Sequence, residues 1–413
     1  MSAAKRRLVR ERVGRVSLEN LAKEEDSLMK FTVKFLKILA VFTLSIFPLP
    51  AVTQAQHYTQ KNLVSDLPQP INADGTNVLV DPNLKNPWGL TRSSTTPAQP
   101  GSPWWVANNN SGTSTLYTGA GVLIPINGTG TVTVPPPNGS PAGTLSTPTG
   151  VVFNGSPTDF LVAPGKFARF IFATEDGTIS GWNSGQNAVL VVDNSDHGSA
   201  NGAVYKGATS GEINGNKFLY VTNFRSAKVE VYDTTFKRVH LDEDAFEAEG
   251  VPRGFAPFNV QNIGGTLFVT YAKQDAPRHD PVGGDGLGFV ELFTPSGKHI
   301  GHLEHGDWFN APWGVVWTTR DFGEFSNAIL VGNFRSGWIA AFNGFTHKFI
   351  GFVRNPDPDN SLMFLDGLWS LTFGNDGGAG PANTLFFTAG INNEQDGLFG
   401  TLTPTDGLDG DEE

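Results

Sequence analysis

The phrase Pro87-Trp88-Gly89-Leu90 decides the fold, because versions of it recur along the chain at an even spacing. Close copies are Pro148-Thr149-Gly150-Val151 and Pro312-Trp313-Gly314-Val315, and looser copies lie between and after them. The third positions of the six phrases are Gly89, Gly150, Gly202, Asn259, Gly314 and Gly367, which are 52 to 61 residues apart. A steady period filled with strand-like segments indicates one supersecondary unit that is stacked many times.

The segments between the phrases read alike from unit to unit. Residues 218–226 and 329–336 each hold a β-rich apolar run that ends in Asn-Phe-Arg-Ser. Each unit has room for about four short strands, which is the size of a propeller blade. We therefore predict an all-β fold, a six-bladed β-propeller. Residues 121–146, rich in Pro, Gly and Thr, are expected to form a long loop or the outer strand of the first blade.

The ends of the chain are expected to close the ring. Residues 58–64 are strand-like and precede the first phrase, whereas the last unit is one strand short of a blade. We predict that this N-terminal strand is the outer strand of the last blade, which covers sheet edges that would otherwise promote aggregation.

The chain resembles a group of uncharacterised, mostly bacterial secreted proteins with an NHL-like six-bladed propeller. The resemblance runs from about Tyr58 to Leu402. It rests on the phrases Asn86-Pro87-Trp88-Gly89-Leu90, Phe172-Ala173-Thr174-Glu175-Asp176-Gly177-Thr178, Tyr271-Ala272-Lys273-Gln274-Asp275, Asp366-Gly367-Leu368-Trp369 and Leu385-Phe386-Phe387-Thr388-Ala389-Gly390. The family implies the fold and brings no established activity, so function has to be argued from the site.

The N-terminal region has the features of an export signal. Lys30, Lys34 and Lys37 precede a short apolar run, and small residues follow at a cleavage spacing before Gln56. We predict that translation starts at Met29, so that residues 1–28 are a mis-assigned or disordered leader, followed by a signal peptide at 29–55, the propeller at 56–402 and an acidic disordered tail at 403–413. The alternatives are a genuine long n-region and a membrane anchor, although the apolar run is short for a span. The expected location is secreted, extracellular or periplasmic.

The amino-acid composition limits the chemistry of the chain and the classes of molecule that it can bind. The chain has no Cys, which excludes disulfides and thiol chemistry. Loss of residues 1–55 would remove ten Lys/Arg and five Asp/Glu, so that the formal charge moves from −11 to −16. A surface this acidic repels nucleic acid and anionic lipid. We expect a monomer without a membrane span in the mature chain, and a small molecule, a sugar or a protein as its partner.

Two sets of residues are expected to surround one mouth of the central channel. If each phrase opens the innermost strand of a blade, the start of that strand and the end of the next lie on one face. The candidate ligand-binding residues are Trp88, Phe258, Trp313, Asn108, Asn223 and Asn333, with Asn392 or Glu394 in the last blade. Aromatic faces with amides suit an organic ligand, which predicts a binding module. The alternative is that these residues serve packing and turns.

The same mouth could instead hold a hard cation. Asn201, Asn259 and Asp366 are candidate metal ligands, and Ca²⁺ is the cofactor that such oxygen donors would take. The predicted arrangement resembles that of six-bladed lactonases of the gluconolactonase type, which bind such an ion at comparable positions. The alternative function is therefore a Ca²⁺-dependent hydrolase or lactonase-like enzyme, or a lyase, with Glu175 or Asp275 as a weak candidate for the base.

A second metal motif is less favoured by the sequence. His299, His302 and His305 are three residues apart. Side chains alternate along a strand, so His302 is expected to point away from the other two. A solvated outer strand is the preferred interpretation.

Overall fold

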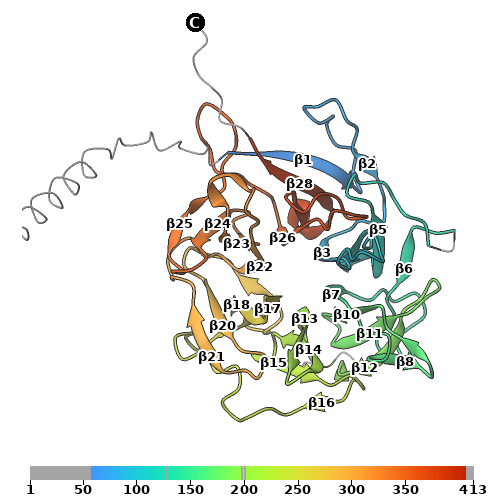
Figure 1. Ribbon diagram of the computed structural model, residues 1–413. Coiled ribbons are helices and arrows are strands. Elements are labelled where there is room, and N and C mark those ends of the chain that lie inside the picture. The colour runs from blue at the N-terminus through green and yellow to red at the C-terminus, as the bar shows by residue number, and fades with distance from the viewer. Residues whose placement is uncertain (1–56, 127, 197–198, 200, 406–413) are drawn as a thin grey trace, which may run out of the picture. The chain divides into compact units, whose positions relative to one another are not determined.

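In the computed structural model, residues 57–126, 128–196, 199 and 201–405 are described. Six of their sheets, in which almost all neighbouring strands are antiparallel, are arranged as the blades of a ring, so the prediction of a six-bladed β-propeller is confirmed (Figure 1). The predicted leader, the signal peptide and most of the acidic tail lie outside the described residues. Within the described part of the chain, no helix is both long and apolar enough to span a membrane.

Each blade is built on four strands, ordered from the centre of the ring outward, and blades 4 and 6 each have a fifth. Blade 1 contains β3 (Pro87–Thr91), β4 (Trp104–Asn108), β5 (Thr113–Tyr117) and β6 (Thr131–Thr133). Blade 2 contains β7 (Pro148–Phe153), β10 (Phe170–Thr174), β11 (Thr178–Trp182) and β12 (Val189–Asp193). Blade 3 contains β13 (Tyr205–Ile213), β14 (Asn216–Asn223), β15 (Lys228–Tyr232) and β16 (Arg238–Val239). The expected outer strand within residues 121–146 is therefore β6.

The second half of the ring repeats this order. Blade 4 contains β17 (Phe255–Ile263), β18 (Thr266–Gln274), β20 (Gly288–Phe293) and β21 (His299–His302), with β19 (Pro281–Val282) beside β18. Blade 5 contains β22 (Pro312–Trp317), β23 (Ala328–Asn333), β24 (Ile339–Asn343) and β25 (Phe349–Phe352). Blade 6 contains β26 (Leu368–Phe373), β27 (Leu385–Ala389), β28 (Leu398–Pro404) and the N-terminal β1 (Tyr58–Ser65), with β2 (Leu79–Val80) outside β1. Among the described residues, the remaining elements are a ribbon and three short helical turns. The ribbon consists of β8 (Leu161–Ala163) and β9 (Lys166–Phe167), and the turns are η1 (Asn109–Ser111), η3 (Gly323–Phe325) and α2 (Ile391–Glu394).

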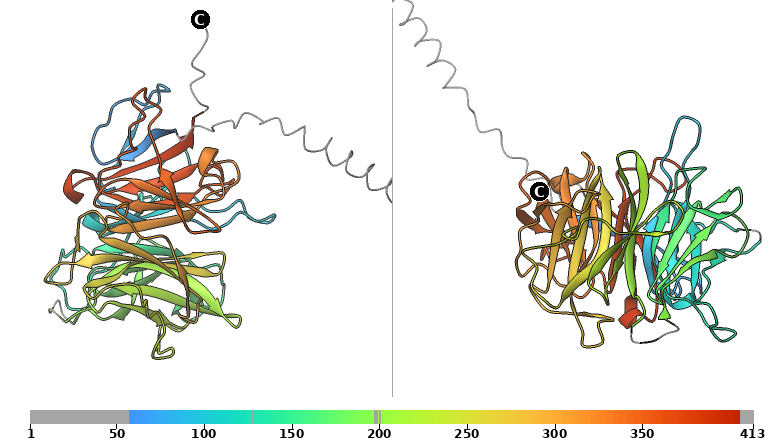
Figure 2. Two further views of the ribbon diagram at one scale, coloured as in Figure 1. Left: turned by 90° about the vertical axis from the view of Figure 1, so that its left-hand side faces the viewer. Right: turned by 90° about the horizontal axis from the view of Figure 1, so that it is seen from below.

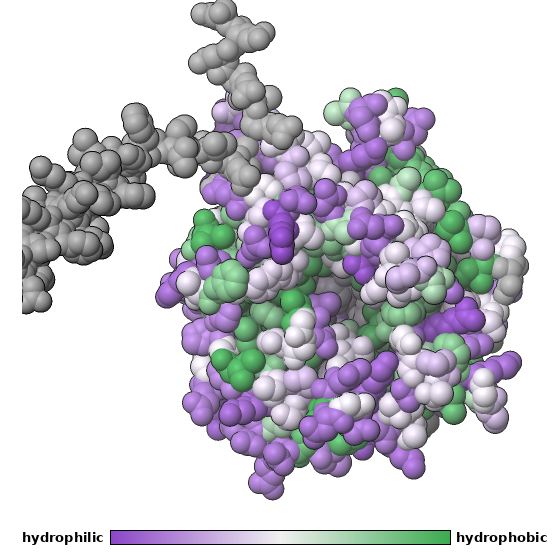
Figure 3. Space-filling view, viewed as in Figure 1, coloured by the Kyte–Doolittle hydropathy of each residue, from purple (hydrophilic) through white to green (hydrophobic). Residues whose placement is uncertain are grey.

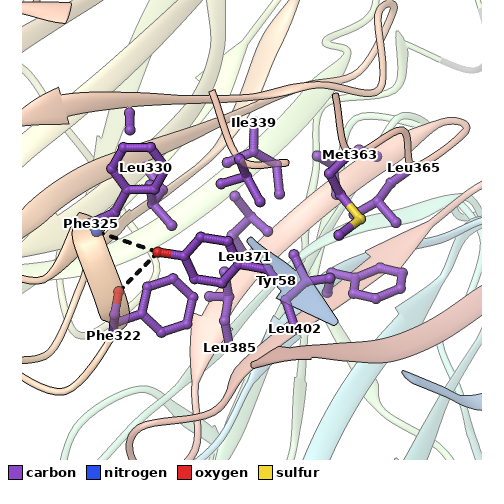
Figure 4. Close-up of a cluster of buried hydrophobic side chains, with 14 of the residues drawn as sticks. Tyr58, Phe322, Phe325, Leu330, Ile339, Met363, Leu365, Leu371, Leu385 and Leu402 are labelled. Carbon is purple, nitrogen blue, oxygen red and sulfur yellow. Dashed lines mark hydrogen bonds between the residues drawn. The ribbon is translucent and has the colours of Figure 1, made fainter. Parts of the chain in front are cut away.

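The first and last strands of the chain close the ring, as predicted. β1 pairs antiparallel with β28 from Tyr58 opposite Pro404 to Ser65 opposite Leu398. Tyr58 is fully buried between blades 5 and 6; its hydroxyl donates to Phe322 O (2.9 Å) and accepts from Phe325 N (3.3 Å). Leu330, Leu365, Leu385 and Leu402 belong to the same apolar cluster (Figure 4). The N-terminal strand thus fastens blade 6 and also packs against its neighbour.

The recurring Pro-x-Gly phrase has a steric cause. A Cβ at Gly89 would lie 2.4 Å from Thr149 O, and one at Gly150 would lie 2.7 Å from Ala208 N. The innermost strands of neighbouring blades therefore approach so closely that a side chain is not tolerated. The pairing of the first two strands is also irregular next to this position in every blade. Irregularities of this kind re-aim side chains and often lie next to functional sites.

Two of the six predicted phrases were placed wrongly. In blade 3, β13 begins at Tyr205, so that Gly207 rather than Gly202 occupies the close-approach position. In blade 6, β26 begins at Leu368, which makes Ser370 rather than Gly367 the counterpart. The residues before them are therefore Lys206 and Trp369. This correction changes which side chains lie next to the close-approach positions at the centre of the propeller.

Candidate functional site

One face of the propeller gathers the starts of the innermost strands and the ends of the second strands, as the sequence predicts. We call its centre the mouth. It is formed by the loops that follow β4, β10, β14, β18, β23 and β27, and by the residues that open β3, β13 and β26. The two side views place α2 on this face, turned away from the viewer of Figure 1 (Figure 2). The opposite face is the one seen in Figure 3, where the surface is hollowed near its middle.

The floor of the mouth is an aromatic cluster. The residues that precede the close-approach positions are Trp88, Thr149, Lys206, Phe258, Trp313 and Trp369. Trp88 stacks on Trp369 with ring centroids 3.5 Å apart, and Trp313 meets Trp88 edge-on at 6.1 Å. The exposed fractions of Trp88, Phe258 and Trp313 are 2%, 0% and 3%. Their rings are covered by one another, so they support the mouth from below and present little surface to a ligand.

Lys206 brings a buried positive charge to this floor. Its ammonium lies 5.2 Å from the centroid of the Trp88 ring and forms ion pairs with Glu175 and, at 3.1 Å, with Asp280. Burial opposes the charged form, but the two carboxylates together raise the pKa of Lys206 above its ordinary value. Lys206 is therefore a fixed cation and not a neutral nucleophile.

Asp280 and His279 follow β18 and form the exposed side of the Lys206 cluster. His279 Nδ1 lies 3.0 Å from Asp280 Oδ1. This bond and the charge of Lys206 hold the pKa of Asp280 well below its ordinary value, and the bond to Asp280 raises the pKa of His279. Metal-type donor atoms of Glu175, His279 and Asp280 all lie within 4.8 Å of one another. Lys206 already places one positive charge between Glu175 and Asp280.

Glu394 approaches the cluster from blade 6 on a strained turn. Asn392, Asn393 and Glu394 have φ angles of 55°, 54° and 66°, a left-handed run that costs free energy, above all for Glu. Asn86 Nδ2 donates to the Glu394 carboxylate (3.3 Å), and Asn110 Nδ2 donates to its backbone oxygen (2.5 Å). Burial raises the pKa of Glu394, and the negative charge of Glu175 raises it further. Two carboxylates in different environments therefore share the mouth.

The repeated asparagines at the ends of the second strands form hydrogen bonds within their own blades. Asn108 donates to Thr115 Oγ1 (3.0 Å), Asn223 to Glu230 (2.9 Å) and Asn333 to Trp338 O (3.3 Å). All three are buried. These predicted ligand-binding residues thus fix the turns that shape the mouth.

The phrase Asn-Phe-Arg-Ser, shared by blades 3 and 5, serves the same turns. Arg225 donates to Gly202 O (2.8 Å) and Arg335 to Pro281 O (3.0 Å), so each guanidinium holds a neighbouring loop. The two phenylalanines, Phe224 and Phe334, pack in the aromatic cluster. The repeat therefore has a structural explanation in both blades.

The structure places the three predicted metal ligands in different settings. Asn259 is buried and donates to Trp313 O (2.9 Å). Asn201 and Asp366 are exposed in the loops before β13 and β26, where Asp366 accepts from Asn392 N (2.9 Å). Asn201 and Asp366 belong to the two phrases that were placed wrongly, so they precede the innermost strands β13 and β26 and do not lie at the positions that open them.

Of the two weak candidates for a base, only Glu175 belongs to the cluster. It lies at the end of β10, accepts from Asn109 Nδ2 (2.7 Å) and pairs with Lys206. Asp275 accepts from His279 N (2.8 Å) and so shapes the loop that carries Asp280. Glu394, which the sequence offered as one of two options, is placed at the mouth.

Sequence reasoning missed Lys206, His279 and Asp280. The signal for Lys206 was present: Tyr205-Lys206-Gly207-Ala208 matches the x-Gly-apolar part of the phrase, with a lysine where other blades have an aromatic or Thr. His279 and Asp280 follow β18 in an irregular loop that no other blade repeats. No periodic pattern could have indicated them.

Comparison with known proteins gives relatives without a stated activity. No known family profile matches the chain. An uncharacterised protein of Acanthamoeba polyphaga mimivirus is 31% identical over 54% of this chain, which spans only 42% of that relative's length. A second uncharacterised mimivirus protein is 28% identical over 78% of this chain and 76% of its own length. These relatives are viral, so the bacterial and secreted parts of the resemblance remain predictions.

Solved structures with a similar chain path have several different activities. They include a virginiamycin B lyase from Staphylococcus aureus (11% identity, 84% of this chain and 98% of that chain, TM-score 0.42). A gluconolactonase from Xanthomonas campestris (12% identity, 77% and 97%, TM-score 0.37) and an aldose sugar dehydrogenase from Streptomyces coelicolor (14% identity, 85% and 99%, TM-score 0.44) are others. Propellers carry many unrelated functions, and so the site itself has to indicate the function.

Proposed function

We propose that the chain is a binding module whose mouth holds a small polar ligand through the ligand's hydroxyl or ammonium groups. The observation that carries the proposal is the strained left-handed turn at residues 392–394. It holds the Glu394 carboxylate beside the Lys206 cluster. Strain of this kind persists only where the surroundings enforce it, and it concentrates at ligand clamps and active sites.

The donors and acceptors at the mouth favour this class of ligand. Glu175 and Asp280 are held by Lys206, and Glu394 is held by Asn86, so three carboxylates are fixed before a ligand arrives. Acceptors held in advance bind hydrogen-bond donors with little loss of entropy. A sugar or an amine offers such donors, whereas an anionic ligand would meet mostly negative charge.

The test is a fluorescence titration with a set of monosaccharides and with the amine spermidine, because Trp88 and Trp313 lie beneath the mouth. For the probe that binds, Glu394→Gln and Asp280→Asn should each weaken binding by about tenfold, the value of one charged hydrogen bond. Glu212→Gln is the control, since Glu212 is exposed near the other end of β13. Equal affinities in all four proteins would exclude the mouth, and no response to any probe would reject this ligand class.

A second candidate function is acid–base catalysis at the same place, as a hydrolase or a lyase. It is favoured by one observation: Glu394 has a raised pKa next to Glu175, which is ion-paired with Lys206. Paired carboxylates in different environments are typical of acid and base partners. The Ca²⁺-dependent form is less favoured, because the ammonium of Lys206 already occupies the place between Glu175 and Asp280 that a cation would take. Turnover of the bound probe that is lost in both Glu394→Gln and Glu175→Gln would replace the binding module by an enzyme.

Export of the chain is a separate proposal, supported by the basic and apolar pattern of residues 29–55. The mature chain would begin at Gln56. N-terminal sequencing of protein collected outside the producing cell tests it. A mature chain that still carries Lys30 or Lys34 would contradict cleavage.

A further inference from the structure

The outer half of blade 4 holds a second group of metal-type donors, remote in the sheet from the innermost strands. Glu291 lies on β20, and His299 and His302 lie on the outermost strand β21. Glu291 is paired with His302, and Phe293 with His299, with a shift of register between Leu292 and Phe293. This irregularity brings both histidines to the side of Glu291, so the expected alternation of His299 and His302 is wrong.

The donor atoms of this group are already close together. One donor atom each of Glu291, His299 and His302 lies within 4.8 Å of the others, and His299 Nε2 lies 2.6 Å from Glu291 Oε2. Glu291 is 4% exposed, whereas His302 is exposed. His305 is excluded, because its ring stacks on Phe289 (4.3 Å) and its Nε2 lies 3.1 Å from Gly286 O.

We propose that Glu291, His299 and His302 bind a divalent transition-metal ion, for which Zn²⁺ is the best match. Two imidazole nitrogens and one carboxylate oxygen are donors that Zn²⁺ accepts, at about 2.0–2.2 Å, with a solvent molecule as the fourth ligand. On binding, the ion takes the place of the hydrogen bond between His299 Nε2 and Glu291 Oε2, and the proton of that bond is released to the solvent. Glu291 is a buried carboxylate, and within the described ranges its one ion-pair partner is His299.

The surroundings favour the arrival of a cation. A groove of about 520 Å³ opens beside His299 and is lined by Asp242, Asp244, Glu247 and Glu249, together with Lys298. Four carboxylates raise the local concentration of cations more than one ammonium lowers it. Binding would also join the four-residue strand β21 to β20, which predicts a more stable blade edge in the presence of the ion.

The experiment is calorimetric titration of the full chain with Zn²⁺ after treatment with a chelator, together with visible absorption of the Co²⁺ form. We expect binding of one ion at this site. The affinity for Zn²⁺ should fall in each of three variants, His299→Ala, His302→Ala and Glu291→Gln. Loss of a residue that only hydrogen-bonds a metal ligand lowers affinity by about 10- to 100-fold, and loss of a ligand itself should cost at least as much. His305→Ala is the matched control and should bind as the unaltered protein does.

Two results would overturn the proposal. One is unchanged affinity in both His299→Ala and His302→Ala, and the other is an equal loss in His305→Ala, which would indicate scattered surface binding. Thermal melting of each variant without metal identifies variants that fail to fold. If His299→Ala unfolds, the exposed His302→Ala and its Co²⁺ spectrum still decide the question.

Discussion

The mouth and the rim of blade 4 contain similar residue types in opposite electrostatic situations. Each holds three donor groups within 4.8 Å, namely Glu175, His279 and Asp280 at the mouth and Glu291, His299 and His302 at the rim. At the mouth, a fully buried ammonium lies among the carboxylates. At the rim, no lysine or arginine among the described residues is paired with Glu291, and its ion-pair partner is the imidazole of His299.

This difference shows that a group of potential ligands is not in itself a metal site. The pKa of Asp280 is lowered because Lys206 and His279 stabilise its charged form, whereas burial raises the pKa of Glu291. The first group is complete as an ion network, and the second gains from a cation supplied by the solvent.

Lys206→Met should give the largest effect. Removal of one partner from a buried ion pair leaves an unbalanced charge and costs about 3–5 kcal/mol in the free energy of unfolding. The measurement is urea denaturation followed by tryptophan fluorescence. Adding Glu175→Gln to Lys206→Met should recover part of the loss, because Glu175 is the less exposed of the two carboxylates. A loss below 1 kcal/mol would contradict the central role of Lys206.

The sequence revealed the ring but not the centre of the site, and the reason is physical. Close approach of the innermost strands forces a glycine at Gly89, Gly150 and Gly314, so a repeated constraint leaves a repeated signal. In blade 3 the innermost strand begins with Tyr205 in place of Pro, and the nearby Gly202 also precedes apolar residues, so it was assigned to the phrase in place of Gly207. Lys206 was therefore passed over.

The loop residues were still harder to predict. Asp280, which carries His279 beside it, reaches Lys206 from a loop whose length no other blade shares. Contacts between blades depend on how the ring closes, which a single repeat does not encode. The rim group was hidden by a local register shift, and alternation along a strand fails at such a position.

The same lysine should decide whether the mouth binds metal. In Lys206→Met, Glu175, His279 and Asp280 lose their cation, and we expect them to bind Mn²⁺, which accepts carboxylate and imidazole ligands. His302→Ala is added both to Lys206→Met and to the protein that keeps Lys206, so that the rim cannot bind the ion. Mn²⁺ should then stabilise only the protein with Lys206→Met. The gain is about 2.7 kcal/mol at 100 times the Kd. Equal stabilisation of both proteins in thermal melting would mean that Lys206 does not exclude cations.

Glu291→Gln should give the smallest change and one of opposite sign. The folded pKa of Glu291 is raised, so its ionisation opposes folding: stability is highest below the ordinary glutamate pKa of 4.5 and falls as the pH rises toward the folded value. With EDTA present, the free energy of unfolding of the Gln variant should equal that of the unaltered protein below pH 4.5 and exceed it at pH 7, by no more than about 1 kcal/mol.

Asp280→Asn is the contrasting variant. Because the folded pKa of Asp280 is lowered, the aspartate stabilises the fold above its ordinary pKa of 3.8, and its replacement should reduce stability at pH 7. Urea denaturation at pH 4 and pH 7 measures both effects. A Gln variant that is less stable at pH 7 would show that the charge of Glu291 is balanced without a metal, and the contrast between mouth and rim would then fail.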